Sequence, residues 1–587
     1  MRLEARLMRA RVLARSSGLP VAGLLLAMAA LAMASALGDS ATFDETAHLA
    51  AGLSYLERGD FRLNPEHPPL VKVWAALPLA LRGADGIDYA SRAWREGNGW
   101  VVGFEMLNGP LASDRRRSPL DRLGPARAAV VLLGVLHGLL VYLWARELRG
   151  RGAGLLALAL FAFCPTVLAH TRLVTTDLAA SLGLFLVLWC FWRFSRRPGL
   201  PRLAALTGAA GLAVTLKHSL LLVFPLLACL GAVWVLRPRS SPATDPDAAC
   251  PTRAGKLAWL SAALAGALLT GWVCLWAVYG FRYEMAREPD FTPDWSWLRP
   301  DSPTVAAAVE VAREHRLLPE AYLYGFCFIL RFEHRLTFLN GRIYVGGDWL
   351  YFPEAFFLKT TPGLLAMLPF ALLCLARGRA SPDFDLLFVG GPALAYFGWA
   401  MTLSLNIGHR HLLPVYPLAY VLVAAGIAAV WDTPLLRRSA VVLLAAHIGS
   451  GLAAFPGYLS YFNRLAGGPA EGWRFLVDSN IDWGQDLPRL KAWMDARGVD
   501  RVHLAYWGTG DPRAYGIDYR KLAFFHDYRT SEPASAPGAG DHVAVSVTLL
   551  QGLGAPSQEM ARFLRRLRDQ LTPVGRAGDS ILIYQLP

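Results

Sequence analysis

Long apolar segments recur along the chain, separated by short clusters of charged residues. Runs of about 17 or more uncharged residues are long enough to cross a hydrocarbon core of roughly 30 Å as helices. The pattern therefore predicts eleven membrane-spanning helices, at residues 18–37, 125–145, 153–169, 174–194, 202–216, 217–236, 257–280, 361–377, 385–405, 412–431 and 437–455.

The first span follows a basic leader and ends in AMASA, which resembles a signal-peptidase site. We expect this segment to be retained as an anchor. Many further spans follow it, and cleavage near Ala36 would separate the pair Asp44-Glu45 from its supporting helix.

Basic residues concentrate in one set of alternating loops. The set comprises the N-terminal leader, ARELRGRG, RFSRRPGLPR, RPRSSPATDPDAACPTRAGK, ARGRA and PLLRR. Because positive loops stay in the cytoplasm, we expect a multi-pass protein of the cell (inner) membrane with a cytoplasmic N-terminus. The other loops and the C-terminal tail then face outward. The net charge of +13 is thus a topology signal and does not indicate a nucleic-acid partner.

Composition agrees with a membrane protein, since 54% of the residues are hydrophobic and only 18% are charged. The seven cysteines form no disulfide framework, and five of them lie in or beside apolar runs, where they are expected to pack as small apolar side chains.

Two outer loops are large, at residues 38–124 and 281–360. The first contains HPPLVKVWAALPLAL, which is too short for a confident span and suits a helix at the membrane interface. The second is rich in aromatic residues, as expected for a loop at headgroup depth.

The chain changes character after the last span, because charge density rises from about residue 456. The segments RVHLAYWG, DHVAVSVTLL and SILIYQLP read as strands, and SQEMARFLRRLRDQL reads as a helix. We therefore expect an all-α polytopic membrane domain at 1–455 and a small extracytoplasmic α/β domain at 456–587.

Ionisable side chains at membrane depth or at the mouth of a span are costly, and they commonly serve a site. Here they gather on the outer side: Asp44, Glu45, Glu66, His67, Lys72, Arg172, Asp177, Lys217, His218, Lys359, His409, Arg410 and His411. The mixture of carboxylates and cations suits transfer of a sugar from a lipid phosphate. Cations stabilise the phosphate leaving group, and one carboxylate acts as general base toward an acceptor hydroxyl.

Each candidate also has a structural interpretation. Asp44, Glu45 and Asp177 are suited to capping helices, and Lys217 and Lys359 fit snorkelling span ends. The HRH motif has two histidines at metal-ligand spacing but no identified third ligand. The acidic and aromatic DSNIDWGQD fits either an acceptor contact or an exposed turn.

Two other function classes stay open at this point. A transporter or flippase of a lipid-linked or anionic substrate predicts inverted repeats and acids at mid-bilayer depth, whereas here the acids lie at span mouths and no repeat is evident. A non-catalytic assembly subunit gives no reason to gather these charges on one face.

The motifs together resemble a known family. They are FDETAHLAAGLSYLERGDFRLNPEHPPLVKVW, TTDLAASL, YGFRYE, GGDWLYFPEAFFLKTTP and NIGHRHLLPVYPLAYVL, followed by YFNRLAGGPAEGWRFLVDSNIDWGQDLPRLKAWM. In order and sidedness they are similar to phospholipid-carrier-dependent GT-C glycosyltransferases, a group that includes protein O-mannosyltransferases, aminoarabinose transferases and the bacterial RgtA/B/C/D-like proteins.

This resemblance implies an inverting transferase that moves one sugar, a hexose or a pentose, from a polyprenyl-phosphate donor to a protein, lipid or glycan acceptor. Asp44 matches the catalytic base, Glu45 lies beside it, and Asp177 matches a second acidic motif that organises the site or a metal. Glu66 and His67 match a position near the carrier phosphate.

The family's basic residue at the position of His67 is lysine, so the phosphate contact there could instead fall to Lys72. Further contacts to phosphate or sugar are expected on charge and sidedness alone, from Arg172, Lys359, His409, Arg410 and His411. A divalent ion, Mg or Mn, is a possible cofactor, because some relatives need one.

Overall fold

The computed structural model describes residues 2–83, 86–109, 118–237, 252–289, 291–332, 334–377, 384–524 and 535–587, with side chains from residue 18 onward. Parts of two loops used for the predicted orientation, at 238–251 and 378–383, lie outside the described residues.

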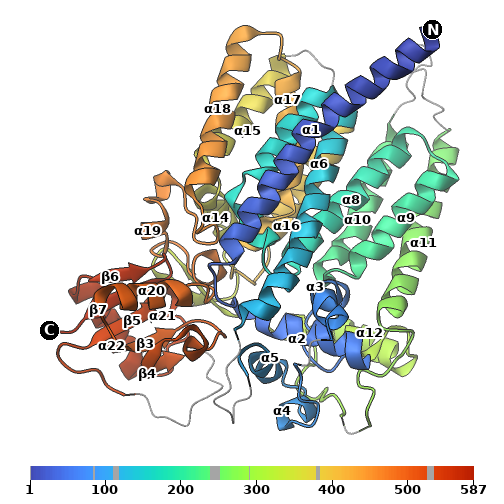
Figure 1. Cartoon of the computed structure of the whole chain (residues 1–587). Helices are drawn as coiled ribbons and strands as arrows, with labels where there is room; N and C mark the ends of the chain where they lie inside the picture. The colour runs from blue at the N-terminus through green and yellow to red at the C-terminus, as the bar shows by residue number, and fades with distance from the viewer. Residues whose placement is uncertain are drawn as a thin grey trace.

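A bundle of long apolar helices forms the body of the protein (Figure 1). Its helices are α1 (Arg2–Ala36), α6 (Leu120–Ala162), α7 (Pro165–Thr171), α8 (Asp177–Arg196), α9 (Leu200–Val214), α10 (Val223–Leu236), α11 (Arg253–Val278), α15 (Pro362–Arg377), α16 (Phe384–Met401), α17 (Val415–Ala428) and α18 (Pro434–Ala453). Short 3-10 helices precede two of them, η1 (His218–Leu222) before α10 and η2 (His409–Leu412) before α17.

The helix α6 is a hairpin of two antiparallel arms. Arg149 and Gly150 leave the helical conformation, and Gly150 has a φ of +81° that glycine adopts without strain. The rings of His137 and Phe161 consequently lie 4.9 Å apart, although 24 residues separate them. The two spans predicted at 125–145 and 153–169 are these two arms.

All eleven predicted spans fall on helices of this bundle. Among the described residues, seven helical segments are long and apolar enough to cross a membrane, when α6 is counted as one segment. The helices α14 (Tyr351–Lys359) and α15 meet at an angle of 108°, and they make an eighth if the two together form one span. The helices α9 and α17 are apolar but shorter. The fold is thus a multi-pass helical membrane protein, and the number of crossings stays a prediction.

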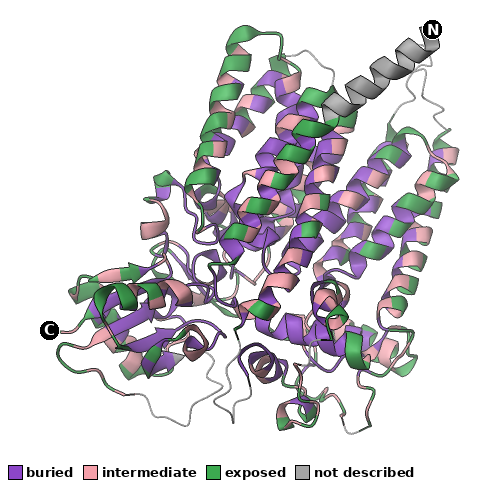
Figure 2. Cartoon of the chain, viewed as in Figure 1, coloured by how far each residue is buried: buried purple, intermediate pink, exposed green. Residues whose placement is uncertain are grey.

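The outward faces of the bundle are apolar, as lipid contact requires. Large apolar side chains such as Leu269 of α11 and Val442 of α18 are exposed, and exposed positions follow the outer faces of these helices while the inner faces are buried (Figure 2). Such continuous exposed apolar surface marks a membrane-facing surface.

The two large loops fold at one end of the bundle (Figure 1). The first contains α2 (Phe43–Arg58), α3 (Leu70–Leu81), α4 (Arg92–Arg95) and α5 (Gly99–Asn108); the second contains α12 (Pro303–Glu314), α13 (Glu320–Arg331), the hairpin of β1 (Leu336–Leu339) and β2 (Arg342–Val345), and α14. The predicted interface helix is α3. It packs tightly on α2, because a Cβ at Gly52 would come within 2.0 Å of the Lys72 carbonyl oxygen.

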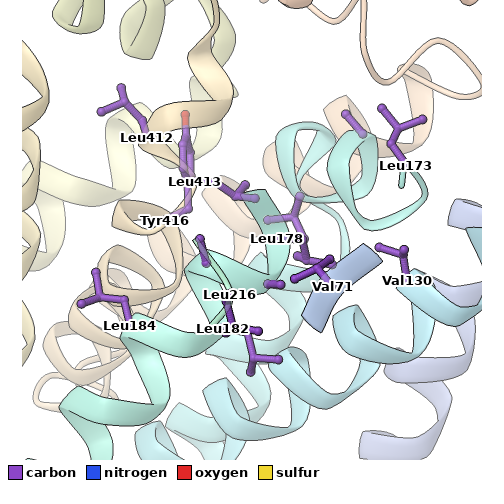
Figure 3. Close-up of a cluster of buried hydrophobic side chains, with 14 of the residues drawn as sticks. Val71, Val130, Leu173, Leu178, Leu182, Leu184, Leu216, Leu412, Leu413 and Tyr416 are labelled. Atoms are coloured by element: carbon purple, nitrogen blue, oxygen red, sulfur yellow. The ribbon is translucent and has the colours of Figure 1, made fainter. Parts of the chain in front are cut away.

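A buried apolar cluster joins these loop helices to the bundle. Val71 of α3, Val130 of α6, Leu178 and Leu182 of α8 and Tyr416 of α17 converge in it (Figure 3). Four helices that are distant in sequence therefore pack together at this end of the bundle. Their close packing fixes the positions of the polar residues described below.

The C-terminal region is an α/β domain at the same end (Figure 1). Its five-stranded sheet has the order β4-β3-β5-β7-β6, in which β3 pairs in parallel with β4 and β5 while β7 runs antiparallel to β5 and β6. The elements are η3 (Arg464–Ala466), α19 (Pro469–Gly472), η4 (Asp478–Asn480), α20 (Leu487–Arg497), β3 (Arg501–Tyr506), η5 (Pro512–Tyr515), β4 (Asp518–Phe524), β5 (His542–Ser546), α21 (Val547–Leu550), α22 (Gln558–Gln570), β6 (Gly575–Ala577) and β7 (Ile581–Gln585).

The three predicted strands contain β3, β5 and β7, and the predicted helix is α22. The last four residues of DHVAVSVTLL were predicted as strand and instead form the helix α21. The strands β4 and β6 were not predicted from sequence, because DYRKLAF carries charges throughout its first half and β6 has only three residues.

Candidate active site

Asp44 lies in the first turn of α2, where the chain leaves α1. Thr42 caps the helix, and its backbone N–H and hydroxyl both donate to the Glu45 carboxylate, at 2.9 and 3.0 Å. The two neighbouring acids therefore have different environments. The Asp44 side chain is 22% exposed, whereas the Glu45 side chain has no exposed surface.

Glu45 is the centre of a buried network with Arg127 of α6. The Arg127 Nε and Nη2 atoms donate to the two Glu45 oxygens at 2.9 and 2.6 Å, and the Val174 N–H donates to one of them at 3.0 Å. Burial alone would raise the pKa of the Glu45 carboxyl, but Arg127 and the backbone donors hold it below its usual value.

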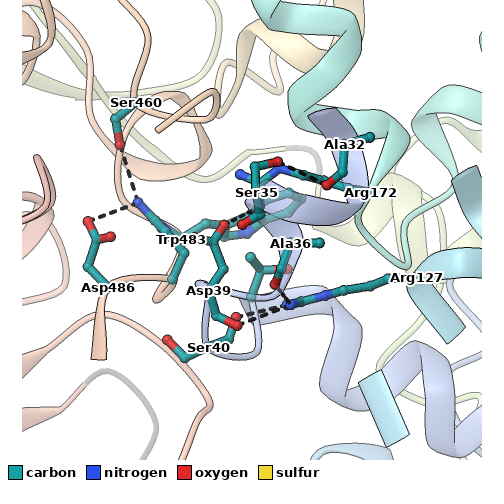
Figure 4. A network of polar contacts seen from close by, with 12 residues as sticks. Ala32, Ser35, Ala36, Asp39, Ser40, Arg127, Arg172, Ser460, Trp483 and Asp486 are labelled. Atoms are coloured by element: carbon teal, nitrogen blue, oxygen red, sulfur yellow. Dashed lines mark hydrogen bonds and ion pairs between the residues drawn. The ribbon is translucent and has the colours of Figure 1, made fainter. Parts of the chain in front are cut away.

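Arg127 also fixes the turn that precedes α2. Its guanidinium donates to the carbonyl oxygens of Ala36, Asp39 and Ser40 at 2.7, 3.1 and 2.9 Å (Figure 4). One buried arginine thus binds both the turn and the Glu45 carboxylate, so that the orientation of Asp44 is set by the groups around it.

Arg410 of η2 bridges the two remaining carboxylates. Its Nη1 atom lies 2.7 Å from Asp44 Oδ2 and 3.5 Å from Asp177 Oδ2, and Asp177 Oδ1 accepts a hydrogen bond of 2.6 Å from Lys217 Nζ. Burial alone would lower the pKa of the Arg410 guanidinium, but Asp44 and Asp177 raise it above its usual value. The result is an alternating array, Lys217–Asp177–Arg410–Asp44, assembled from four parts of the chain.

Exposure separates the roles that the two acids of this array can take. Asp177 is 2% exposed and bonded to two cations, whereas Asp44 is 22% exposed and bonded to one. A general base must reach the proton of an incoming group, so only Asp44 combines access with a fixed orientation.

The segment that leads into the C-terminal domain closes one side of this array. The Trp483 ring lies under the Arg410 guanidinium, with its centroid 4.2 Å from Cζ. Trp483 is 2% exposed, and a cation–π contact that is shielded from water contributes about 2 kcal/mol.

Buried and half-buried imidazoles lie beside the array. The His67 ring centroid is 6.4 Å from that of His48 and 6.3 Å from that of His218, and His67 Nδ1, itself buried, has no hydrogen-bond partner in the described part of the chain. Burial, reinforced by the Lys217 ammonium, lowers the pKa of His67 well below its usual value. This imidazole is therefore neutral and able to donate one hydrogen bond to an anion. Glu66, next to it, is partly exposed.

Three cations that were predicted to contact the donor are bonded within the protein. Lys72 Nζ donates to Asn64 Oδ1 at 3.0 Å, and Lys359 Nζ donates to the Leu459 carbonyl at 2.9 Å. Arg172 is completely buried and forms an ion pair with Asp39 (Figure 4). The structure brings none of the three into the array around Arg410.

The two histidines of HRH have separate surroundings. His409 Nε2 shares a hydrogen bond of 2.8 Å with the Tyr416 hydroxyl, and His411 Nε2 is buried without a partner. Among the residues that the structure describes, no group of three or more His, Cys, Asp or Glu side chains is placed to hold a metal ion.

Residues 478–486, called the linker below, run from η4 to the start of α20, and Asp482 ties this segment to the C-terminal sheet. Its carboxyl accepts a hydrogen bond from the Thr548 N–H at 3.1 Å, and its other oxygen lies 3.4 Å from the Ser546 hydroxyl. Burial raises the pKa of the Asp482 carboxyl to about 8, so it is largely protonated at neutral pH.

A stability measurement tests this environment. The pKa of Asp482 in the folded protein lies above the value of about 3.9 in an unfolded chain, so its contribution is complete below about pH 4 and is lost as pH rises toward 8. Asp482→Asn keeps the shape without titrating. Its Tm relative to wild type should rise between pH 5 and 9. A Tm difference that does not change with pH would contradict the assignment.

Arg127 was not among the candidates predicted from sequence, whereas Lys217 was a candidate that also fitted a snorkelling span end, and Trp483 lay in DSNIDWGQD, which fitted either an acceptor contact or an exposed turn. Arg127 and Lys217 carried a usable signal, since each is a lone cation inside or between apolar runs. Trp483 carried none beyond its position in DSNIDWGQD, because its contact with Arg410 joins positions 73 residues apart.

The first part of the bundle matches a known family. Residues 121–241 match the family model described as dolichyl-phosphate-mannose-protein mannosyltransferase. This segment contains Arg127, Asp177 and Lys217, and over its length it confirms the resemblance to GT-C glycosyltransferases. No curated protein sequence matches the chain.

Several solved structures are similar to this chain over part or most of its length. ArnT from Cupriavidus metallidurans, bound to undecaprenyl phosphate, is 14% identical with a TM-score of 0.48, covering 96% of this chain and 97% of that chain. The S. cerevisiae protein O-mannosyltransferase Pmt1-Pmt2 complex, bound to the sugar donor, is 18% identical with a TM-score of 0.33, covering 45% and 33%.

AglB from Archaeoglobus fulgidus, an archaeal oligosaccharyltransferase in complex with an inhibitory peptide and a dolichol-phosphate, is 14% identical with a TM-score of 0.41, covering 89% and 61%. At these identities and TM-scores, the likenesses establish neither an activity nor a site for this chain.

Proposed function

We propose that this protein is a membrane glycosyltransferase that moves one sugar from a polyprenyl-phosphate donor to an extracytoplasmic acceptor, with Asp44 as general base. The observation that carries the proposal is the array Lys217–Asp177–Arg410–Asp44, in which one partly exposed carboxylate lies beside cations that an anionic leaving group needs. The family match over residues 121–241 supports the class of donor.

The reaction is a single displacement. The acceptor hydroxyl gives its proton to Asp44 while its oxygen forms a bond to the anomeric carbon. The bond between that carbon and the phosphate oxygen breaks, and its electron pair leaves with polyprenyl phosphate. Asp44 then releases the proton to water. One displacement without a covalent intermediate inverts the anomeric configuration.

The charge that develops on the phosphate needs donors that are fixed before the reaction begins. Arg410 is the best placed, because it already lies at hydrogen-bond distance from Asp44. His67 and His411 add neutral imidazole groups with unpartnered ring nitrogens. No step is assigned to a metal ion.

The other two acids support these groups. Asp177 bonds both Lys217 and Arg410, so we assign it to holding the cations in place. The Glu45 carboxylate is buried and hydrogen-bonded to other groups of the protein, so we assign it to holding the turn before Asp44. Arg172 and Lys359 also bond to other groups of the protein, so we assign them a structural role.

Loop charges support a site outside the cytoplasm. Those basic loops that the structure describes lie at the end of the bundle opposite α2 (Figure 1), and positive loops stay in the cytoplasm. We therefore infer that the N-terminus is cytoplasmic and that Asp44, the two large loops and the C-terminal domain face the outer side of the cell (inner) membrane. A lipid-linked donor is available there at the bilayer surface.

Product analysis tests the proposal. Purified protein in lipid nanodiscs should consume a radiolabelled polyprenyl-phosphate sugar from a panel of hexose and pentose donors, offered with peptide, lipid and glycan acceptors. Polyprenyl phosphate and glycosylated acceptor should appear in equal amounts, with the anomeric configuration inverted. Nucleotide sugars should not replace the lipid donor, and retention of configuration would contradict a single displacement by one base.

A further inference from the structure

Trp483 contacts Arg410 and the residue that precedes Asp44 in the chain. Its ring lies against the Arg410 guanidinium at 4.2 Å, and its carbonyl oxygen accepts a hydrogen bond of 3.0 Å from the N–H of Phe43, which precedes Asp44. Asp44 and Arg410 lie 366 residues apart in the chain. Trp483, which belongs to a third segment, contacts Arg410 directly and the backbone next to Asp44.

The backbone on the Arg410 side is bonded to the same segment. Asn480 Oδ1 accepts a hydrogen bond of 2.8 Å from the His409 N–H, and the Ser479 hydroxyl donates to the Ile407 carbonyl at 2.8 Å. These bonds fix the chain on either side of Arg410, so that the position of η2 depends on the linker.

The backbone on the Asp44 side is bonded in the same way. The Ser40 N–H donates to the Gln485 carbonyl at 2.9 Å, and the Ser40 hydroxyl donates to the Gly484 carbonyl at 2.7 Å. From the sheet domain, the Thr509 hydroxyl lies 2.8 Å from the Thr46 hydroxyl and donates to the Phe43 carbonyl at 3.1 Å.

A position over an aromatic ring suits a guanidinium that must bind at its edge. The ring contributes no hydrogen-bond acceptor, so the N–H groups of the arginine stay available to carboxylate or phosphate. Trp483 therefore restrains the position of Arg410 without using its donors, and a displaced guanidinium would misplace both the base and the leaving-group contact.

We propose that Trp483 is a positioning residue that orients Arg410 between Asp44 and Asp177, which makes the linker and the C-terminal domain an integral part of the active site. The inference rests on the proposed transferase function. Under this inference the C-terminal domain does more than cover the outer face of the bundle, because it also holds the reacting groups in place.

Two substitutions in the full-length protein test this role. Trp483→Leu removes the ring, and Trp483→Phe keeps an aromatic face. We expect Trp483→Leu to lower kcat for sugar transfer by about 10- to 100-fold while KM for the donor changes much less. Trp483→Phe should recover most of the lost kcat.

Trp144 supplies the matched control. It is fully buried, as Trp483 is, but its ring packs on Phe185 and Trp192 away from the array. Trp144→Leu should lower the Tm to a similar degree while kcat of the folded fraction stays near wild type. Equal losses of kcat in the two leucine variants, or none in Trp483→Leu, would overturn the inference.

A second measurement does not depend on activity. Trp483 and its neighbours bury Arg410, so the rate at which phenylglyoxal modifies Arg410, followed by mass spectrometry, should increase in Trp483→Leu and not in Trp144→Leu. An unchanged rate refutes the positioning role. Wild-type protein that transfers no sugar from any donor refutes the proposed function, whichever modification rate is found.

Discussion

Asp44→Asn is expected to lower the rate of sugar transfer by about 10²- to 10⁴-fold, the usual contribution of a general base. The amide has nearly the same shape and can still accept a hydrogen bond from Arg410, so the fold and the affinity for donor should change little. Transfer rates measured at saturating donor, with Tm and donor binding measured alongside, separate lost chemistry from lost structure.

Asp385 provides the matched control for this variant. Its side chain is 16% exposed and pairs with Arg196 at the opposite end of the bundle. Asp385→Asn removes one carboxylate in a similar setting and should leave transfer unchanged. Transfer by Asp44→Asn within about threefold of wild type would assign the base to another residue.

Arg127→Met is expected to destabilise the protein by about 3–5 kcal/mol, because it leaves the Glu45 carboxylate buried without its cation. The same change also removes the donors to Ala36, Asp39 and Ser40. Thermal unfolding followed by tryptophan fluorescence should show a large fall in Tm, and transfer should fall as well because the turn before Asp44 is released.

Two comparisons sharpen this result. Adding Glu45→Gln to Arg127→Met removes the uncompensated charge, so the double variant should be more stable than the single one. Arg193→Leu breaks a half-exposed ion pair with Glu147, 3.6 Å long, and should cost at most about 1 kcal/mol. A Tm for Arg127→Met as high as that of Arg193→Leu would show that the buried network is not needed for the fold.

The helices of the bundle could be predicted from sequence because the length of an apolar run is a local property. Each predicted span fell on a helix, and even the α6 hairpin was visible, since the charged ARELRGRG interrupts two apolar runs. The number of membrane crossings is harder to predict, because it depends on tilt and bending, as at the 108° angle between α14 and α15.

The site could be predicted only in part. Asp44, Asp177 and Arg410 were predicted, and the structure places them together, because ionisable residues at span mouths gather on one side. Which of them pair depends on contacts between distant segments. Glu45 looks equivalent to Asp44 in sequence, and only the packing of Arg127, 82 positions away, distinguishes the two acids.

Separating transfer from transport tests the central claim most directly. Purified protein would be given labelled polyprenyl-phosphate sugars in nanodiscs, with Asp44→Asn and Asp385→Asn beside wild type, while proteoliposomes report movement of the same lipids between leaflets. Sugar transfer by wild type and Asp385→Asn, lost in Asp44→Asn, is the predicted result. Flux of the lipid-linked substrate with no transfer from any donor would contradict the account and identify a transporter.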